Sequence, residues 1–287
     1  MTDAMVDLSA WVTNAPQGTP RFRQAIHIIL HAIASDPRLR ETLCLKGGIL
    51  MALRYGSERF TTDLDFSTPS VYDDAIRQTT LSRLNTALSV ASMALGYDVA
   101  CRIQSHSIDP SADATYVNLK MKVGYAVIGT RQHRRLMEGK PVSEIVALDY
   151  SFLESIPELQ TVHISDDLTV CVYGMTTLVA EKYRALLQQP IRNRKRRQDP
   201  YDIALLLDKQ PELETPEFRK AVLDALFIKC KDRDITPTRA SIQDPEVTAM
   251  AAAEYSQLAA ELPNGRLPPF DSVYKRISTY YQALPWN

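Results

Sequence analysis

The chain of 287 residues has little cysteine, and its four cysteines lie far apart with no CxxC pair among them: Cys44, Cys101, Cys171 and Cys230. A structural zinc site, which draws on closely spaced cysteine and histidine ligands, is therefore not expected. Each cysteine has apolar sequence neighbours, which is typical of free thiols in a hydrophobic core. Unpaired thiols suit a reducing compartment, so the sequence predicts a cytoplasmic protein.

Long apolar runs and an excess of charge of one sign are also missing. No segment approaches the roughly 20 apolar residues of a membrane span, and no basic-then-apolar signal opens the chain, so no membrane association is expected. Lys and Arg number 33 and Asp and Glu number 34, so the total charge gives no indication of nucleic-acid binding and any such indication must come from local clusters. Hydrophobic residues make up 45%, enough for a sizeable core without disulfides or metals.

Hydrophobic periodicity divides the chain into a mixed part and a helical part. Up to about residue 170, helical patterns alternate with strand patterns: helices at 21–35, 49–55 and 73–95, and strands near 64–66, 97–104, 116–128, 144–152 and 168–173. From 175 onward nearly every pattern is helical: 176–188, 200–207, 216–229, 245–262 and 272–284. Thr176 and Thr177 are candidate caps of the first of these helices. We predict an α+β fold, with a mixed-sheet domain at 1–170 and a helical domain at 171–287.

Two aspartates stand two residues apart in a strand-like segment. Asp63 and Asp65 alternate with the apolar Leu64 and Phe66. Residues i and i+2 of a strand point to the same face, so the two carboxylates can approach a hard cation such as Mg²⁺ together. Two such ions clamp the attacking and leaving oxygens of a phosphoryl displacement. An isolated DxD is weak evidence, because surface turns contain it often.

A glycine pair precedes this segment and makes it more specific. Gly47 and Gly48 lie between an apolar strand-like segment and a helical pattern. Glycines let a triphosphate approach the backbone, and the following helix offers free N–H groups. A lone glycine pair is more often an ordinary turn. The ordered set of glycine turn, helix, linker and DxD strand favours nucleotide chemistry.

The segment 45–67 resembles the AbiEii family of nucleotidyltransferase toxins, which is related to the MenT toxins and belongs to the DNA polymerase beta-like nucleotidyltransferase superfamily. The family pattern is close to K-G-G-[ST], a helix with an Arg, then R-[FL]-[ST]-x-D-[LI]-D-F. This chain matches it at Lys46, Gly47, Gly48, Arg54, Arg59, Phe60, Thr61, Asp63, Leu64, Asp65 and Phe66. It departs at Ile49, where the family has Ser or Thr, and so lacks one hydroxyl that could donate to the triphosphate.

Two later segments resemble the same family. The strand 146–151 looks like its strand with a single acidic residue, which implies Asp149 as a third metal-binding carboxylate and as the base toward the attacking hydroxyl. An exposed alternating strand residue is the other interpretation of Asp149. The segments 180–186 and 197–202 resemble A-E-K-x-x-A-L and R-x-D-x-x-D. They imply Lys182 as a phosphate contact and Asp199 as a further catalytic residue, with Asp202 second to it. A solvated lysine and a helix N-cap before Pro200 remain the alternatives.

Two clusters of basic residues and a histidine pair give weaker indications of function. A dense basic run, composed of Arg192, Arg194, Lys195, Arg196 and Arg197, is either a phosphate-binding track or a solvated loop. Arg131 and 133–135 form a looser basic cluster on a predicted loop. His27 and His31 share one helix face, where core packing is favoured over a metal site.

The function expected from these residues is transfer of a nucleoside monophosphate from an NTP to an acceptor hydroxyl, with Mg²⁺ or alternatively Mn²⁺ as cofactor. Asp63, Asp65 and Asp149 are the expected metal ligands, and catalysis is assigned to them together with Lys182 and Asp199. The expected nucleotide-binding residues are Lys46, Gly47, Gly48, Arg59, Thr61 and Lys182.

The resemblance also implies a biological setting. It implies the tRNA 3′ end as a candidate acceptor and a cognate antitoxin encoded nearby, with no direct contact required. The alternatives are a transferase that modifies an antibiotic or a protein, and a non-catalytic nucleotide-binding module. Neutralising the basic run is expected to weaken an RNA-directed enzyme and to leave a small-molecule enzyme nearly unchanged.

Overall fold

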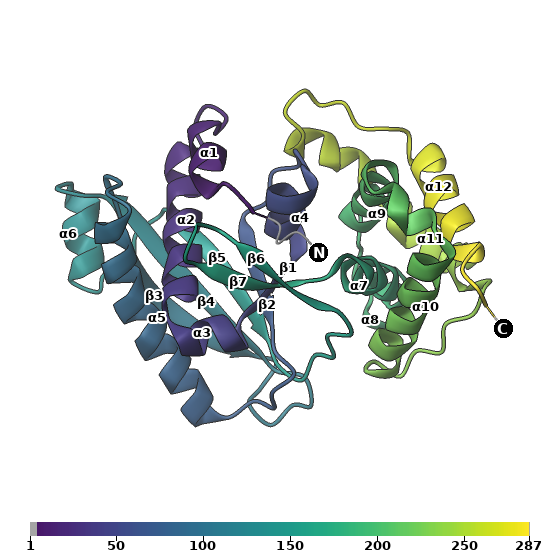
Figure 1. Ribbon diagram of the computed structural model, residues 1–287, viewed down its shortest axis with the longest axis horizontal. Helices are drawn as coiled ribbons and strands as arrows, with labels where there is room; N and C mark the ends of the chain where they lie inside the picture. The colour runs from purple at the N-terminus through teal and green to yellow at the C-terminus, as the bar shows by residue number, and fades with distance from the viewer. Residues whose placement is uncertain (1–4, 287) are drawn as a thin grey trace. The chain divides into compact units, whose positions relative to one another are not determined.

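The computed structural model describes residues 5–286 and divides into two compact units (Figure 1). The N-terminal unit comprises the chain up to Leu53, Thr62–Glu154 and Gln160–Val172. The helical unit comprises Arg54–Thr61, Ser155–Leu159 and the chain from Tyr173 onward. The main division therefore falls close to residue 170, but two short upstream stretches group with the helical unit. Arg59 and Thr61 belong to that unit, and residues 1–4 and 287 of the predicted domains lie outside the described chain.

A seven-stranded mixed sheet forms the centre of the N-terminal unit, with strand order β3-β4-β5-β2-β1-β7-β6. The β2–β5 and β1–β7 pairs are parallel, whereas β1–β2, β3–β4 and β4–β5 are antiparallel. The strands are β1 Cys44–Lys46, β2 Asp63–Ser67, β3 Val99–Asp109, β4 Asn118–Val127, β5 Ile145–Ser151, β6 Leu159–His163 and β7 Thr169–Tyr173. The predicted α+β class with a mixed sheet is confirmed, while β6 has no counterpart among the predicted strands.

One face of this sheet is apolar and covered by helices. Along β5, Val146, Leu148 and Tyr150 are fully buried, and the residues between them are partly exposed. Helices α2 Pro20–Ser35 and α5 Asp74–Ala94 pack against the strands on the buried side (Figure 1). A strand with one buried and one open face alternates in this way because successive side chains point to opposite faces. The opposite face is consequently available to polar groups.

The helices of this unit begin and end at recognisable signals. Pro20 occupies the first turn of α2, and the Asp73 carboxylate accepts from the Ala75 N–H at the start of α5. Gly96, just beyond α5, has φ +66°, as expected for a helix-terminating glycine. The shorter helices are α1 Leu8–Thr13, α3 Pro37–Thr42, α4 Gly47–Tyr55 and α6 Arg131–Met137. The loop predicted around Arg131 was wrong, because Thr130 caps a helix there by accepting from the His133 N–H.

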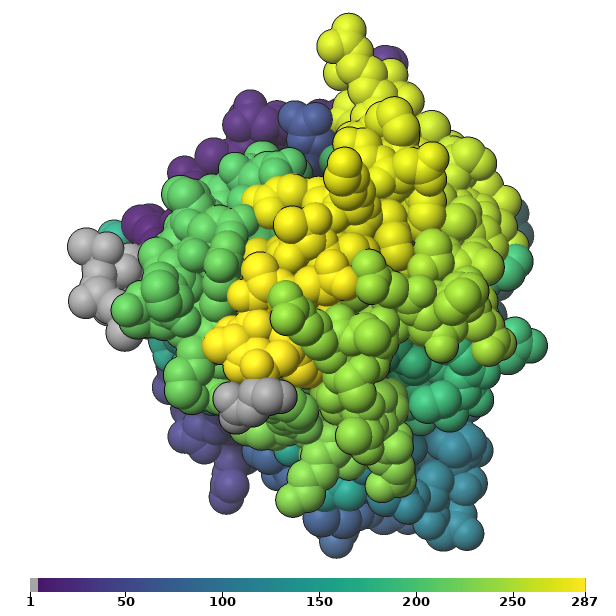
Figure 2. Space-filling model, turned by 90° about the vertical axis from the view of Figure 1, so that its right-hand side faces the viewer, coloured from purple at the N-terminus to yellow at the C-terminus, as the bar shows by residue number. Residues whose placement is uncertain are grey.

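Six helices and three short 3-10 turns make up the described part of the chain after Gly174. In the space-filling view the yellow C-terminal segment, which contains α12, has the green surface of earlier segments of this unit on both sides (Figure 2). The Tyr183 hydroxyl donates to the Ile277 carbonyl at 2.8 Å and links α7 to α12. The elements are α7 Met175–Leu187, α8 Gln189–Arg192, α9 Gln198–Lys209, η1 Pro211–Glu214, α10 Pro216–Lys231, η2 Ser241–Gln243, α11 Pro245–Ala252, η3 Tyr255–Glu261 and α12 Phe270–Gln282.

Two local predictions for this unit were wrong. The helix predicted over 245–262 is interrupted where Glu254 adopts φ +65°, a conformation that ends a right-handed helix. Thr176 and Thr177 do not cap α7, because Gly174 is its N-cap residue and both threonines lie inside the helix. Their hydroxyls donate instead to the carboxylate and the backbone carbonyl of Glu158.

The histidine pair and three of the four cysteines lie as predicted, whereas Cys171 is only partly buried. All four cysteines are free, and three of them are buried. His27 is buried and its Nδ1 lies 2.8 Å from the Tyr97 hydroxyl, so it packs in the core. Burial, with a smaller contribution from His31, lowers the pKa of His27 to about 4. No helix within residues 5–286 combines the length and the apolar character needed to cross a bilayer.

Candidate active site

Three carboxylates project from the open face of the sheet in the N-terminal unit. Asp63 and Asp65 lie on β2, and parallel pairing with β5 sets Asp149 directly opposite Asp65. Directly paired residues share a face, so all three side chains lie opposite the helix-covered side. The structure thus brings together an aspartate pair and a third aspartate from a strand more than 80 residues further along the chain.

Gly47 lies against the central carboxylate of this group. Gly47 adopts φ +75°, and a Cβ built on it would lie 2.0 Å from Oδ2 of Asp65. Only a residue without a side chain can occupy this position, because the carboxylate fills the space that a Cβ needs. Lys46, one residue earlier, is paired with Asp65 across the antiparallel β1–β2 ladder. The glycine turn and the aspartate strand therefore form one local structure.

The helix that begins at Gly47 explains why an apolar residue stands at position 49, where the family has Ser or Thr. Gly47 and Gly48 are the first two residues of α4 rather than a separate turn before it. The first backbone N–H groups of a helix have no partner within it and can donate to a phosphate. Ile49 is 1% exposed and packs in the core. Residue 49 therefore adds no side-chain donor to a phosphate contact at this turn.

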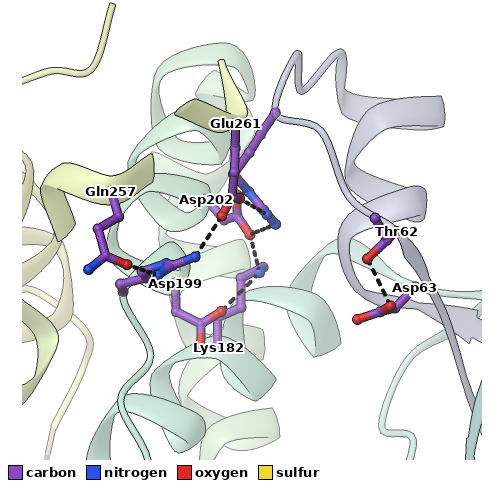
Figure 3. Close-up of polar contacts among 9 residues, drawn as sticks. Thr62, Asp63, Lys182, Asp199, Asp202, Gln257 and Glu261 are labelled. Atoms are coloured by element: carbon purple, nitrogen blue, oxygen red, sulfur yellow. Dashed lines mark hydrogen bonds and ion pairs between the residues drawn. The ribbon is translucent and has the colours of Figure 1, made fainter. Parts of the chain in front are cut away.

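The donor set of the sheet face suits a hard cation. Asp63 accepts a hydrogen bond from the Thr62 hydroxyl at 3.0 Å (Figure 3). No three His, Cys, Asp or Glu side chains among residues 5–286 are gathered as ligands of one ion. The three aspartates nevertheless supply only oxygen donors, from two adjacent strands and on one face, which is the kind of donor that Mg²⁺ prefers.

Lys182 lies in a buried ion-pair network within the helical unit. Its Nζ on α7 donates to Asp202 at 2.6 Å and to Asp199 at 3.1 Å, both on α9 (Figure 3). The lysine side chain is 8% exposed, and those of Asp199 and Asp202 are 6% and 0% exposed. Burial by itself lowers the pKa of Lys182, but the two aspartates outweigh it and the pKa is raised. Lys182 is therefore not a solvated helix lysine.

The aspartates of this network occupy helix positions that the sequence did not indicate. Asp199 is the second residue of α9, whose N-cap is Arg197, so the N-cap interpretation of Asp199 was wrong. Asp202 lies one turn further on and is the more enclosed of the two. Burial raises its pKa, but Lys182 and Arg59 hold the pKa below its ordinary value.

Arg59 completes the network from a distant part of the chain. Its guanidinium lies 3.4 Å from Asp202 and donates to Glu261 at 2.8 Å. The side chain is 10% exposed, and these two carboxylates raise its pKa despite the opposing effect of burial. Glu261, which no sequence motif indicated, also accepts from Arg197 at 2.9 Å. Thr61, two residues after Arg59, is partly exposed.

A model of a protein family, described as the nucleotidyl transferase AbiEii toxin of type IV toxin–antitoxin systems, matches residues 28–276. The chain belongs to the AbiEii family. It is accordingly a nucleotidyltransferase-family enzyme and a toxin of a toxin–antitoxin system, as the sequence motifs predicted, and the family model adds that the system is of type IV. Among curated protein sequences, none matches this chain.

Solved structures share the fold of this AbiEii protein. The MenT4 nucleotidyltransferase toxin of Mycobacterium tuberculosis aligns with a TM-score of 0.55 and 14% identity, over 96% of this chain and 87% of that one. A putative nucleotidyltransferase from Helicobacter pylori aligns with a TM-score of 0.54 and 14% identity, over 94% of this chain and 96% of that one. These alignments support the fold, and their low identity carries no residue assignments.

The glutamate of the A-E-K motif has a structural role in this AbiEii protein. Glu181 accepts from Arg184, and its other oxygen lies 3.0 Å from Lys229 Nζ. Lys229 is 1% exposed and also donates to the Ser155 carbonyl at 2.9 Å. The motif therefore places Glu181 and Lys182 in two different ion-pair networks of the helical unit.

The basic run of the AbiEii protein separates into neutralised and open residues. Lys195 pairs with Glu254 at 2.6 Å, and Arg197 donates to Gln257 at 2.6 Å in addition to Glu261. Arg192 and Arg194 are exposed and pair with no carboxylate of the described chain. Burial and the neighbouring arginines, Arg233 foremost, lower the pKa of Arg192. Arg192 and Arg194 are thus the part of the run whose positive charge is exposed and has no carboxylate partner among the described residues.

Proposed function

We propose that this enzyme transfers a nucleoside monophosphate from an NTP to an acceptor hydroxyl and releases pyrophosphate, acting in the cytoplasm. Two linked observations carry the proposal: the sheet register sets Asp149 opposite Asp65, and the Asp65 carboxylate lies against Gly47. Carboxylates that share a face beside a glycine turn suit the handling of a metal-bound triphosphate.

Asp63, Asp65 and Asp149 would hold Mg²⁺, or Mn²⁺ in its place, and the ion would neutralise charge that develops on the phosphates. Asp149 is also the candidate base toward the acceptor hydroxyl, because it lies on the strand farther from the glycine turn. The N–H groups at the start of α4, together with Lys46, would bind the triphosphate.

Lys182, Asp199 and Arg59 have a narrower proposed role. Lys182 is already paired with Asp199 and Asp202, so contact with a phosphate requires it to exchange one carboxylate for that anion. Such an exchange keeps the lysine paired, and the displaced carboxylate keeps an arginine nearby, since Arg196 lies 3.7 Å from Asp199 and Arg59 lies 3.4 Å from Asp202. Arg59 supports this arrangement through its ion pair with Asp202. Arg59 and Thr61 are also proposed to contact the nucleotide directly.

The proposed acceptor is an RNA, with the tRNA 3′ end as the candidate that the family resemblance implies. The open arginines Arg192 and Arg194 support an anionic acceptor. A double substitution of Arg192 and Arg194 to Ala is expected to weaken tRNA binding, whereas Arg197→Ala removes a charge that is held by Gln257 and Glu261. Equal effects of the two variants, or none, would favour an antibiotic- or protein-modifying enzyme.

The deciding experiment incubates the protein with Mg²⁺, each labelled NTP and total tRNA. Wild-type protein is expected to label RNA, and Asp65→Ala to abolish labelling because it removes the central carboxylate. Calorimetry with each NTP identifies a binding module without turnover. Absence of both transfer and NTP binding would reject the proposal.

As a type IV toxin, the protein is expected to have a cognate antitoxin encoded nearby, and the two products need not touch. Induced expression in bacteria should arrest growth for wild type and not for Asp65→Ala. Arrest by both proteins would remove nucleotidyl transfer from the toxic mechanism.

A further inference from the structure

The open face of the sheet carries a row of charged residues that extends beyond the carboxylates. Across adjacent strands, Lys46 on β1 pairs with Asp65 on β2, Asp65 with Asp149 on β5, and Asp149 with Lys120 on β4. Each step across a sheet is about 4.8 Å. The row therefore has a lysine at each end and two carboxylates at its centre.

A second lysine of β4 lies on the same face. Lys122 is paired with Ala147, and Ala147 is paired with Asp63, so Lys122 is two strands from the first aspartate. Met121, between the two lysines, is 1% exposed and points to the helix-covered side. On the neighbouring β3, Ser107 and Ser105 are paired with Lys120 and Lys122 and add hydroxyl groups to the face.

These lysines are accessible to a ligand. Lys122 is exposed and forms no ion pair with any described residue. Lys120 lies 2.8 Å from Asp109, with both side chains about half exposed, at 46% and 52%. An exposed pair of this kind contributes little stability and is readily exchanged for another anion.

The strand order assigns the two ends of the row to different substrates. The glycine turn follows β1, on one side of the carboxylates, and the lysines of β4 lie on the other side. In an in-line displacement the attacking hydroxyl and the leaving pyrophosphate lie on opposite sides of the phosphorus. A triphosphate bound at Gly47 and Gly48 therefore leaves the β5–β4 side to the acceptor.

We propose that Lys122 and Lys120 bind the phosphate backbone of a nucleic-acid acceptor and hold its terminal hydroxyl beside Asp149. This inference rests on the proposed nucleotidyl transfer. Phosphates approaching Asp63 and Asp149 meet like charge, and two lysines on the next strand offset that repulsion. Lysine is a point charge without the fork geometry that reads bases, so the contact is independent of sequence.

The test compares Lys122→Ala, Lys122→Arg and the Lys120→Ala/Lys122→Ala double variant with wild type. Arg83→Ala is the matched control: Arg83 is 44% exposed, pairs with Asp36 at 2.9 Å and lies on α5, which covers the opposite face. Binding of a fluorescently labelled single-stranded RNA oligonucleotide is followed by anisotropy over a range of salt concentrations. Transfer to total tRNA is measured in parallel, with KM and kcat determined separately.

Loss of one phosphate contact is expected to reduce the slope of log K against log salt by about 0.7, and to weaken RNA binding at low salt about threefold. KM for tRNA should rise while the calorimetric Kd for NTP stays unchanged. Lys122→Arg should retain binding, since it keeps the charge. In the double variant the slope should fall by about twice as much as in Lys122→Ala.

Unchanged RNA affinity and slope in the double variant would overturn the inference, as would an equal loss in Arg83→Ala. Failure of the proposed function gives a different result. A wild-type protein that binds the oligonucleotide through Lys122 but transfers no nucleotide would reject nucleotidyl transfer and retain the phosphate-binding surface.

Discussion

At the scale of single residues, the candidate site depends on the absence of a side chain or a hydroxyl at some positions as much as on the charged groups at others. Gly47 is needed because the Asp65 carboxylate occupies the space of a Cβ. Ile49, buried in the core, supplies no hydroxyl to the candidate phosphate-binding turn. Lys182 is fully engaged by aspartates before any substrate binds. Each of these properties can be tested by one substitution.

Replacing Gly47 by Ala should abolish transfer, because the added Cβ displaces the Asp65 carboxylate. The positive φ adds a cost of roughly 1–2 kcal/mol to folding. Gly129→Ala is the matched control, since Gly129 has φ +85° with open space around it. Gly47→Ala should lose more stability than Gly129→Ala in urea titrations, because the steric conflict with Asp65 adds to the cost of the positive φ, and only Gly47→Ala should lose transfer. Full activity of Gly47→Ala would show that Asp65 has another route to its position.

The free energy of unfolding should depend on Asp202 at low pH. The folded-state pKa of Asp202 lies below its ordinary value, so its contribution is present above about pH 4 and is lost as pH falls through the folded pKa. Asp202→Asn should flatten the decline of stability below about pH 4 while lowering stability at pH 7. Urea titrations across this pH range test the prediction, and parallel curves for both proteins would contradict it.

At the scale of elements, the parallel β2–β5 pair sets the geometry of the site. Its register fixes Asp65 opposite Asp149 and leaves the intervening side chains in the core. Neither strand could be recognised as the partner of the other from the sequence alone. The alternation in each strand showed which residues share a face of that strand, whereas the pairing is decided by packing over the whole sheet.

Asp149→Asn should eliminate transfer and change the midpoint of thermal unfolding little, because the repulsion from Asp65 and the attraction to Lys120 on the two neighbouring strands are lost together. Ser151→Ala, two residues further on the same face of β5, is the control and should retain activity. Transfer assays and thermal denaturation of both variants provide the comparison. An active Asp149→Asn would support the interpretation of Asp149 as an ordinary surface residue of the strand.

The sequence predicted elements well where a periodic pattern was long, as in α2, α5 and α10. It failed where local signals were short. The stretch 131–137 has only two large apolar residues, and a single threonine cap, Thr130, is too common a signal to indicate a helix. β6 has only Val162 buried along its length, too little for a recognisable pattern.

The candidate site residues divide in the same way, into those that motifs indicate and those that depend on packing. Asp63, Asp65, Gly47 and Lys182 followed from motifs, but the partners of Lys182 depend on the packing of α7 against α9. Lys120 and Lys122 already alternated with buried residues in a predicted strand. What the sequence could not provide was the pairing of that strand with the strand of Asp149.

At the scale of the whole molecule, the proposed functional residues are distributed over two separately packed units. The carboxylates and the glycine turn belong to the N-terminal unit, and the Lys182 network belongs to the helical unit. Such units open with their own free energies, so damage to one network should remain largely local.

Asp202→Ala should therefore raise hydrogen exchange in α7 and α9 and leave the sheet protected. Breaking a buried ion pair by removing one partner costs about 3–5 kcal/mol, since Lys182 and Arg59 lose their shared carboxylate. Hydrogen-exchange mass spectrometry resolves the two units by peptide. Asp208→Ala, an exposed site on the same helix, is the control. Uniform loss of protection over the chain would show that the units unfold as one.

The register of β2 and β5 also limits how relatives of this protein can diverge. One residue inserted into or deleted from either strand turns its later side chains to the opposite face, which would bury aspartates under α2 and α5 and expose core residues. Changes of length are then tolerated in exposed connections, such as 110–116, but not within the two strands. A lineage can lengthen its loops or exchange its helices, yet the spacing within these two short strands must be inherited intact for as long as the chemistry is kept.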